Sequence, residues 1–253
     1  MSGHSKWSTI KRKKGAIDAK RGKIFTKIIK EISIAVKEGG SPDPESNPRL
    51  RLAISNAKGA NMPKDNIDRA IKKASEKDGA NYEETTYEGY GPNGVAIFVE
   101  ASTDNLNRTV SNVRAVFSKY NGSLGTNGSL EFIFDRKGVF TIPLSNISMD
   151  DDDFEMELID GGADDVEKDD DVLMAYTTFE NFGNMQKKLE NLGLEVESAE
   201  LQRIPNTTVT IDVHAAKTIM NMVERFEEDD DVNNVYHNLE MTDELMEQLS
   251  QDS

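Results

Sequence analysis

The sequence contains no cysteine and few histidines, and these two shortages exclude several kinds of site. Without cysteine the chain has no disulfide, no thiolate metal ligand and no cysteine nucleophile. Its three histidines, His4, His214 and His237, lie far apart, and none belongs to a zinc-binding spacing. Neither a Walker A sequence nor a G-x-S-x-G motif occurs. We therefore expect a protein that is not an enzyme and that needs no metal and no cofactor.

Long hydrophobic runs are also absent. Runs such as Val95–Val99 are far shorter than the roughly 20 residues of a membrane-spanning helix. A secretory signal is not indicated, because Lys11–Lys14 is not followed by a continuous apolar stretch. A mitochondrial transit peptide is an alternative, since the N-terminal segment is basic and poor in acids, but such peptides favour Arg and Ser over Lys. We expect a cytoplasmic protein with no membrane partner.

The charge of the chain is divided unequally. The formal net charge is −16, from 30 Lys/Arg and 46 Asp/Glu. Residues 1–80 hold 19 of the Lys/Arg and 9 of the Asp/Glu, whereas residues 81–253 hold 11 and 37. Segregation of this kind favours a nucleic acid as the partner of the basic part, and solvated surface for the acidic remainder.

A basic amphipathic helix is predicted near the N-terminus. Asp18 is a candidate N-cap, and Gly39-Gly40 is a natural stop. On a helical wheel, four cations share an arc of about 80°: Lys20, Lys23, Lys27 and Lys30. The opposite arc is apolar: Phe25, Ile28, Ile29, Ile32 and Val36. One face can dock on a core while the other presents a row of ammonium groups. Such a helix can also lie on a membrane, but its apolar face has partners nearby in the sequence.

Those partners are two further helices. Asn47-Pro48 has the pattern of an N-cap and first helical residue, and Pro63 starts the third helix. We therefore predict an α-helical domain over residues 18–80, preceded by a basic, mobile arm at residues 1–17. Within the arm, Trp7 has two interpretations: it stacks on an unpaired base, or it packs on the helical domain.

The candidate nucleic-acid-binding residues come from this arm and the first helix. Most are cations that can replace counterions on phosphates. They are His4, Lys6, Trp7, Lys11, Arg12, Lys13, Lys14, Lys20, Arg21, Lys23, Lys27 and Lys30.

A different pattern begins after Ala80. Tyr82–Tyr90 and Val95–Val99 have strand character, and a helix follows with Leu106, Val110, Val113 and Phe117 on one stripe. Gly89–Gly94 matches G-x-G-x-x-G, but it opens a strand rather than a helix, so we predict a hairpin and no dinucleotide site. This unit starts an α/β middle domain over residues 81–129 and 205–240.

Residues 130–204 are predicted to form an inserted, acidic, ferredoxin-like βαββαβ domain. The expected strands are 131–134 and 139–142, joined across 135–138, then 165–167, 172–177 and 196–202, with helices at 152–159 and 179–192. The chain then returns with a strand at 209–211, a helix at 213–226 and a strand at 232–236, before an acidic tail at 241–253. The acidic runs at 150–153, 169–171 and 229–231 lack the spacing of a calcium loop and are interpreted as solvated surface.

Several motifs together resemble the YebC/PmpR family. They are GHSKW at 3–7, DAKRGKIFTKII at 18–29, NPRLR at 47–51, TDNLNRTV at 103–110, GTNG at 125–128 and the stretch 231–240. Leu106 and Asn121 stand where the family often has Arg and Gly. The resemblance implies an α+β, multidomain protein with three parts: a helical domain, an α/β domain, and a ferredoxin-like domain inserted in the second. It also implies DNA-binding transcriptional regulation, although some relatives, including organellar ones, are implicated in easing ribosomes past difficult sequences such as proline runs.

The residues indicate binding to phosphates, but they do not choose between DNA and RNA. Arg69 and Asn66 are the only candidate base readers in the helical domain, and no recognition helix is identified. A lysine-rich arm also suits rRNA. A protein-interaction scaffold would leave the arm unexplained. We expect a non-enzymatic nucleic-acid-binding regulator of gene expression, with a ribosome- or rRNA-binding translation factor as the alternative; whether the chain dimerises stays open.

Overall fold

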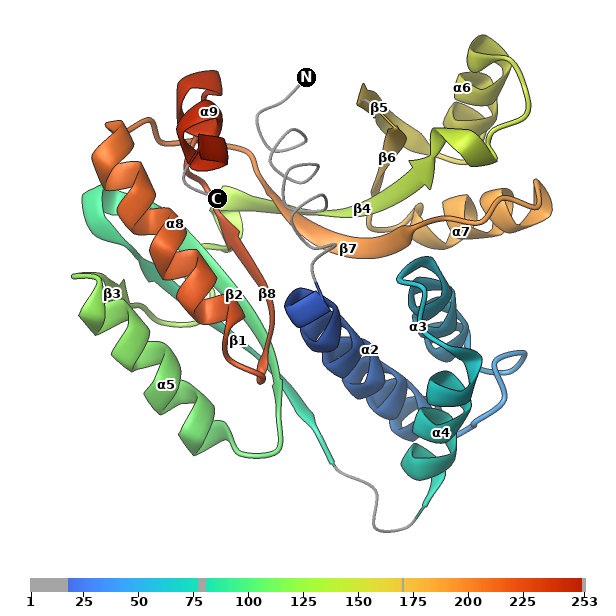
Figure 1. The fold of residues 1–253 in the computed structure, drawn as a ribbon, viewed down its shortest axis with the longest axis horizontal. Helices are drawn as coiled ribbons and strands as arrows, with labels where there is room; N and C mark the ends of the chain where they lie inside the picture. The colour runs from blue at the N-terminus through green and yellow to red at the C-terminus, as the bar shows by residue number, and fades with distance from the viewer. Residues whose placement is uncertain (1–17, 77–80, 170, 252–253) are drawn as a thin grey trace. The chain divides into compact units, whose positions relative to one another are not determined.

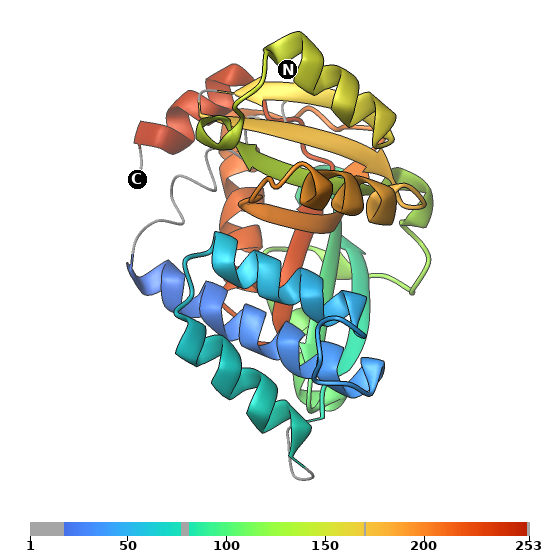
Figure 2. The same ribbon diagram turned by 90° about the vertical axis from the view of Figure 1, so that its right-hand side faces the viewer.

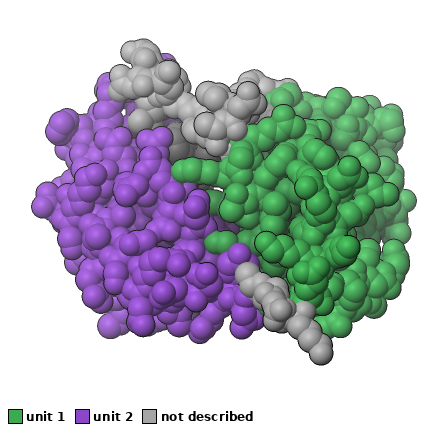
Figure 3. All heavy atoms as spheres, turned by 60° about the horizontal axis from the view of Figure 1, so that its bottom comes forward, with its two compact units in different colours: residues 1, 11–80, 136–202 green, residues 2–10, 81–135, 203–253 purple. Residues whose placement is uncertain are grey.

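The computed structural model describes residues 18–76, 81–169 and 171–251, with the backbone alone at both ends of this range (Figure 1). The chain divides into two compact units. One contains the helical domain with residues 136–202, and the other contains residues 81–135 with residues 203 onward (Figure 3). The candidates His4, Lys6, Trp7, Lys11, Arg12, Lys13 and Lys14 lie outside the described residues.

The helical domain has the three expected helices. They are α2 (Asp18–Gly39), α3 (Pro48–Gly59) and α4 (Lys64–Ser75), which lie side by side (Figure 2). Apolar residues at helical spacing form their shared core: Ile32, Ala35, Val36, Leu50, Ala53, Ala57, Met62, Ile67, Ala70 and Ala74. This small core fixes which faces of the helices point outward.

Asn47 connects the end of α2 to the start of α3. Its side chain caps α3 by accepting a hydrogen bond from the Leu50 amide at 3.0 Å. Its Nδ2 also donates to the Ala35 carbonyl at 2.7 Å. Gly39 makes this contact feasible, because a Cβ there would lie 2.3 Å from that same Nδ2 atom. The turn between the helices is thus specified by one buried side chain.

The inserted domain is ferredoxin-like, as predicted. Its elements are β4 (Phe134–Pro143), α6 (Asp151–Asp160), β5 (Ala163–Asp169), β6 (Val172–Thr178), α7 (Phe182–Asn191) and β7 (Ser198–Pro205). The antiparallel sheet has the order β5-β6-β4-β7, in which each βαβ unit skips one strand. Helices α6 and α7 cover it through Phe154, Leu158, Met185 and Leu189.

One part of that prediction is wrong. No strand forms at Glu131–Ile133, which is a 3₁₀ turn, whereas the strand expected at 139–142 is present and begins earlier, as β4 (Phe134–Pro143). The segment 135–138 resembled a turn because it ends in glycine. Gly138 instead lies inside the strand, where a Cβ would be 2.4 Å from Thr177 Oγ1 and 2.6 Å from the Phe182 ring. The glycine is required by packing and not by chain reversal.

The middle domain contains a four-stranded sheet of order β3-β1-β2-β8. Its elements are β1 (Glu83–Tyr90), β2 (Ala96–Thr103), α5 (Leu106–Lys119), β3 (Ser123–Leu124), α8 (Val213–Glu227), β8 (Val232–His237) and α9 (Asp243–Gln251). The predicted β1–β2 hairpin is present, and its turn at Pro92–Gly94 opens β2. At the end of α5, Asn121 has φ 56°, a left-handed conformation that suits the family's usual glycine and that asparagine tolerates.

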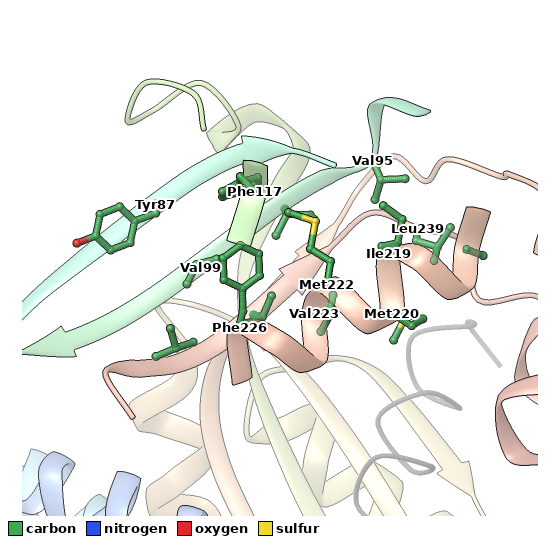
Figure 4. Packing of buried hydrophobic residues seen from close by; sticks show 14 of the residues in the cluster. Tyr87, Val95, Val99, Phe117, Ile219, Met220, Met222, Val223, Phe226 and Leu239 are labelled. Atoms are coloured by element: carbon green, nitrogen blue, oxygen red, sulfur yellow. The ribbon is translucent and has the colours of Figure 1, made fainter. Parts of the chain in front are cut away.

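Helices α5 and α8 share one apolar core with the sheet. Phe117 of α5 meets Phe226 of α8 edge-on, with 5.1 Å between the ring centroids, beside Val99 of β2 (Figure 4). The predicted strand at 209–211 is wrong, because only Val209 pairs there, in a parallel bridge with Leu239. The segment expected as an acidic tail forms α9, whose Leu245 and Met246 are buried in this core.

None of the helices described is long and apolar enough to cross a bilayer.

Candidate nucleic-acid interface

The candidate cations of α2 do not share one exposed row. Lys23 is exposed, Lys27 is half-buried, and Lys30 is only 6% exposed. A helical wheel separates the apolar face from the polar face, but it does not show which part of the polar face the fold covers. Arg21 is exposed, and it donates to the Asn61 carbonyl at 3.4 Å with its guanidinium above the Phe25 ring.

Two acidic residues of α2, Glu31 and Glu38, are bound by an arginine of α3. Arg49 donates to both carboxylate oxygens of Glu31, at 2.7 and 3.1 Å, and also pairs with Glu38. Two of the negative charges of the domain are thereby used to hold α3 against α2. Because Asn47 caps α3 and Leu50 is buried, the NPRLR motif is explained by the fold of the domain.

Helix α4 offers cations that are absent from the sequence-based set. Lys64, Lys72 and Lys73 are exposed, and within the described part of the chain none of their ammonium groups has a hydrogen bond or ion pair. The same wheel that gave the α2 candidates could have found them, since Ile67, Ala70 and Ala74 define the buried stripe. Exposed ammonium groups on a small domain can contact phosphates without rearrangement.

The two candidate base readers on α4 contact each other. Arg69 pairs with Asn66 Oδ1 through Nη2, and its Nε donates to the Asp65 carbonyl at 3.1 Å. Both groups are held in contacts along their own helix. Reading a base edge would require these contacts to break, so this arrangement favours contacts with a nucleic-acid backbone.

The helical domain is joined to the acidic insert within one unit. Asn56 of α3 accepts from the Ala199 amide at 2.9 Å and donates to the Ala199 carbonyl at 3.0 Å, as a neighbouring strand would. Leu52 packs on the core of the insert, and a Cβ at Gly59 would lie 2.0 Å from the Glu197 carbonyl oxygen. Edge strand β7 is therefore covered by α3, and the two domains contact closely.

The TDNLNRTV motif and the late 231–240 stretch meet in the middle domain. Asp231 Oδ2 accepts from Arg108 Nη2 at 2.7 Å, Thr109 Oγ1 at 2.9 Å and Thr103 Oγ1 at 3.1 Å. Burial acts to raise the pKa of Asp231, but these hydrogen bonds outweigh it and hold the pKa below its ordinary value. The network ties β2 and α5 to β8, so these motifs maintain the fold.

The GTNG motif is held by a buried carboxylate. Glu88 is 2% exposed and accepts from the amides of Gly128 at 2.7 Å and Leu130 at 2.6 Å. Gly128 has φ +83°, which favours glycine, while Thr126 and Asn127 are exposed. The contacts of this loop with Glu88 hold its backbone in place, so the GTNG motif serves the fold.

The acidic runs form no metal site among the described residues. Among the residues searched, which are the described ones, no three His, Asp or Glu side chains are placed to hold a metal ion. Asp150 caps α6 through the Asp152 amide, and Asp151 pairs with Lys168 at 2.6 Å. Asp150 and Asp151 therefore serve a helix cap and a surface ion pair.

Comparisons with known proteins identify the family of the chain. A family model described as the TACO1/YebC protein N-terminal domain matches residues 5–77, and one described as the TACO1/YebC second and third domain matches residues 82–239. A Geobacter protein named "Probable transcriptional regulatory protein" is 52% identical over 250 residues, covering 98% of this chain and all of that protein. A Clostridium tetani protein of the same name is 52% identical over 245 residues, covering 96% and 99%.

A solved structure has the same fold. The crystal structure of a conserved hypothetical protein from Aquifex aeolicus is 43% identical to the chain, with a TM-score of 0.80 over 90% of this chain and 94% of that one. The motifs, the three domains and these relatives lead to one conclusion: the chain belongs to the TACO1/YebC family.

Proposed function

We propose that this protein is a nucleic-acid-binding regulator of gene expression that acts in the cytoplasm without catalysis. Relatives that are 52% identical to this chain are named probable transcriptional regulatory proteins. The observation that carries the proposal is the charge of the helical domain. Its Glu31 and Glu38 are bound by Arg49, while Lys64, Lys72 and Lys73 of α4 stay exposed.

Binding would be driven mainly by cations that replace counterions on phosphates. The basic arm contributes His4, Lys6, Trp7, Lys11, Arg12, Lys13 and Lys14, and α2 contributes Lys20, Arg21, Lys23 and Lys27. Trp7 would add about 1–3 kcal/mol if it stacks on an unpaired base. The acidic insert, which contacts the helical domain through Asn56, repels the same polyanion and restricts how a strand can lie.

A second function, binding of rRNA or the ribosome to assist translation, is supported by the contacts of Arg69. Its bonds to Asn66 and the Asp65 carbonyl occupy the candidate base readers. A protein that grips backbones without reading bases suits structured RNA at least as well as an operator.

Competition binding tests the proposal and separates its two forms. Labelled scrambled DNA duplex is bound at one moderate salt concentration, and the unlabelled competitors are the promoter of the protein's own gene, the scrambled duplex and purified ribosomes. We expect similar competition by the two duplexes and efficient competition by ribosomes.

Each alternative result has a distinct meaning. A promoter that outcompetes the scrambled duplex by about a thousandfold, with ribosomes inert, would support operator-specific transcriptional regulation. Failure of the protein to bind any of the three would refute nucleic-acid binding altogether.

A further inference from the structure

The glycines inside the helices are of two kinds. A Cβ at Gly39 would lie 2.3 Å from Asn47, and one at Gly59 would lie 2.0 Å from the Glu197 carbonyl, so both glycines are required by contacts within the chain. A Cβ at Gly22 would meet no atom within 4 Å. Glycine destabilises a helix interior relative to alanine, and α2 continues for four turns beyond this position. Among the residues that the structure describes, no contact requires glycine at residue 22.

Two exposed cations flank Gly22 on α2. With about 100° of rotation per residue, Arg21 and Lys23 project to either side of it, and both are exposed. One turn further on, the Thr26 hydroxyl donates back to the Gly22 carbonyl at 3.1 Å. Among the described residues, no side chain covers the backbone at Gly22, and the neighbouring Thr26 hydroxyl is bonded to the helix itself.

We propose that Gly22 is the point at which a phosphodiester strand lies directly against α2. The missing Cβ allows a sugar–phosphate unit to approach the helix backbone, where Arg21 and Lys23 flank it with positive charge. Arg21 is already held by Phe25 and the Asn61 carbonyl, so its guanidinium is ordered before the strand arrives. This inference rests on the proposed function and adds a position for close contact.

Gly183 provides a matched control. It is also exposed, it lies in a helix, α7, and a Cβ there would meet nothing within 4 Å. It belongs to the acidic insert, which the proposal keeps away from the strand.

The experiment compares Gly22→Ala, Gly22→Leu and Gly183→Ala in the full chain. The probes are a short DNA duplex and an RNA duplex of the same sequence, bound at one fixed salt concentration. Gly22→Ala is expected to weaken binding about tenfold and Gly22→Leu more, because added bulk forces the strand away from the helix. Gly183→Ala should bind as the unaltered protein does. A loss of affinity for either duplex in the Gly22 variants supports the proposal. The duplex whose affinity falls more shows whether the strand at Gly22 is DNA or RNA.

Melting temperatures complete the test. Gly22→Ala should melt no lower than the unaltered protein, because alanine favours the helix. A lower melting temperature would overturn the inference, since the glycine would then serve the chain's own fold. Unchanged affinity of both Gly22 variants, or an equal loss in Gly183→Ala, would also overturn it. If the unaltered protein binds neither duplex, the proposed function itself fails.

Discussion

The helical domain and the ferredoxin-like insert form one unit with opposite charges. Residues 18–76 hold 13 Lys/Arg and 8 Asp/Glu, whereas residues 136–202 hold 5 and 18. In the helical domain, Glu31 and Glu38 are bound by one arginine. In the insert the pairing is reversed, with the scarce cations bound by acids: Lys137 by Asp164, Lys168 by Asp151, and Lys188 by Glu157 and Asp160.

Each domain thus uses part of its scarcer charge internally, two of eight acids in the helical domain and three of five cations in the insert, and is left with an excess of the commoner one. The Lys188 contacts raise the pKa of that ammonium group and lower the pKa of Asp160, because each charge stabilises the other. Through Asn56 and Gly59, the positive domain is held against the negative one. A polyanion that binds the first is repelled by the second, which favours orientation over non-specific coating.

Removing the charge of the arm should produce the largest effect on binding. Changing Lys11, Arg12, Lys13 and Lys14 to Ala removes four cations, and we expect affinity for a DNA duplex to fall about a hundredfold at moderate salt. Circular dichroism should show an intact fold. As a control, Lys187→Ala, an exposed lysine of the insert, should change affinity less than about twofold. Equal losses in the two variants would show that the location of the charge is irrelevant.

The join between the two domains should be sensitive to one methyl group. Gly59→Ala places a Cβ against the Glu197 carbonyl and should lower the free energy of unfolding by about 2 kcal/mol. Asn56→Ala, which removes both hydrogen bonds to Ala199, should cost about 1–2 kcal/mol. Urea denaturation measures both, with Gly183→Ala as the control. A neutral Gly59→Ala would mean that the domains are not packed as described.

Neutralising the insert should have the smallest effect and the opposite sign. Asp152→Asn, Asp153→Asn and Glu155→Gln together remove three exposed charges from α6. We expect duplex affinity to rise about threefold at low salt and to be unchanged at high salt, because repulsion over a distance is screened. Filter binding at two salt concentrations measures this. Weaker binding would instead indicate that the acidic face contacts the ligand.

The sequence predicted features that depend on local patterns. The helices of the first domain were predicted because Asn47, Pro48 and Pro63 mark their starts and apolar spacing marks their buried faces. Gly138 was misinterpreted because a glycine required by a ring across the sheet looks the same in sequence as one required by a turn. The strand at 209–211 was expected from β-branched residues, but the fold gives it only one bridge.

Features that depend on contacts far apart in the chain were not predicted. Arg108 and Asp231 are 123 positions apart, and no local pattern shows that they pair. The burial of Lys30 and the exposure of Lys64, Lys72 and Lys73 likewise follow from how the helices pack. Charge therefore selected the helical domain as the candidate interface, while the exposure of its individual cations required the structure.

The salt dependence of binding tests the central claim most directly, namely that the basic arm and helical domain form the contact surface. If five or six of their cations contact phosphates, log K for a DNA duplex should fall with log salt at a slope of about −4 to −5. The Lys11/Arg12/Lys13/Lys14→Ala protein keeps one or two of these contacts and should have a slope of about −1 to −2, whereas Lys187→Ala should keep the full slope. A nearly flat dependence for the unaltered protein, or a full slope in the protein lacking the four arm cations, would contradict the account.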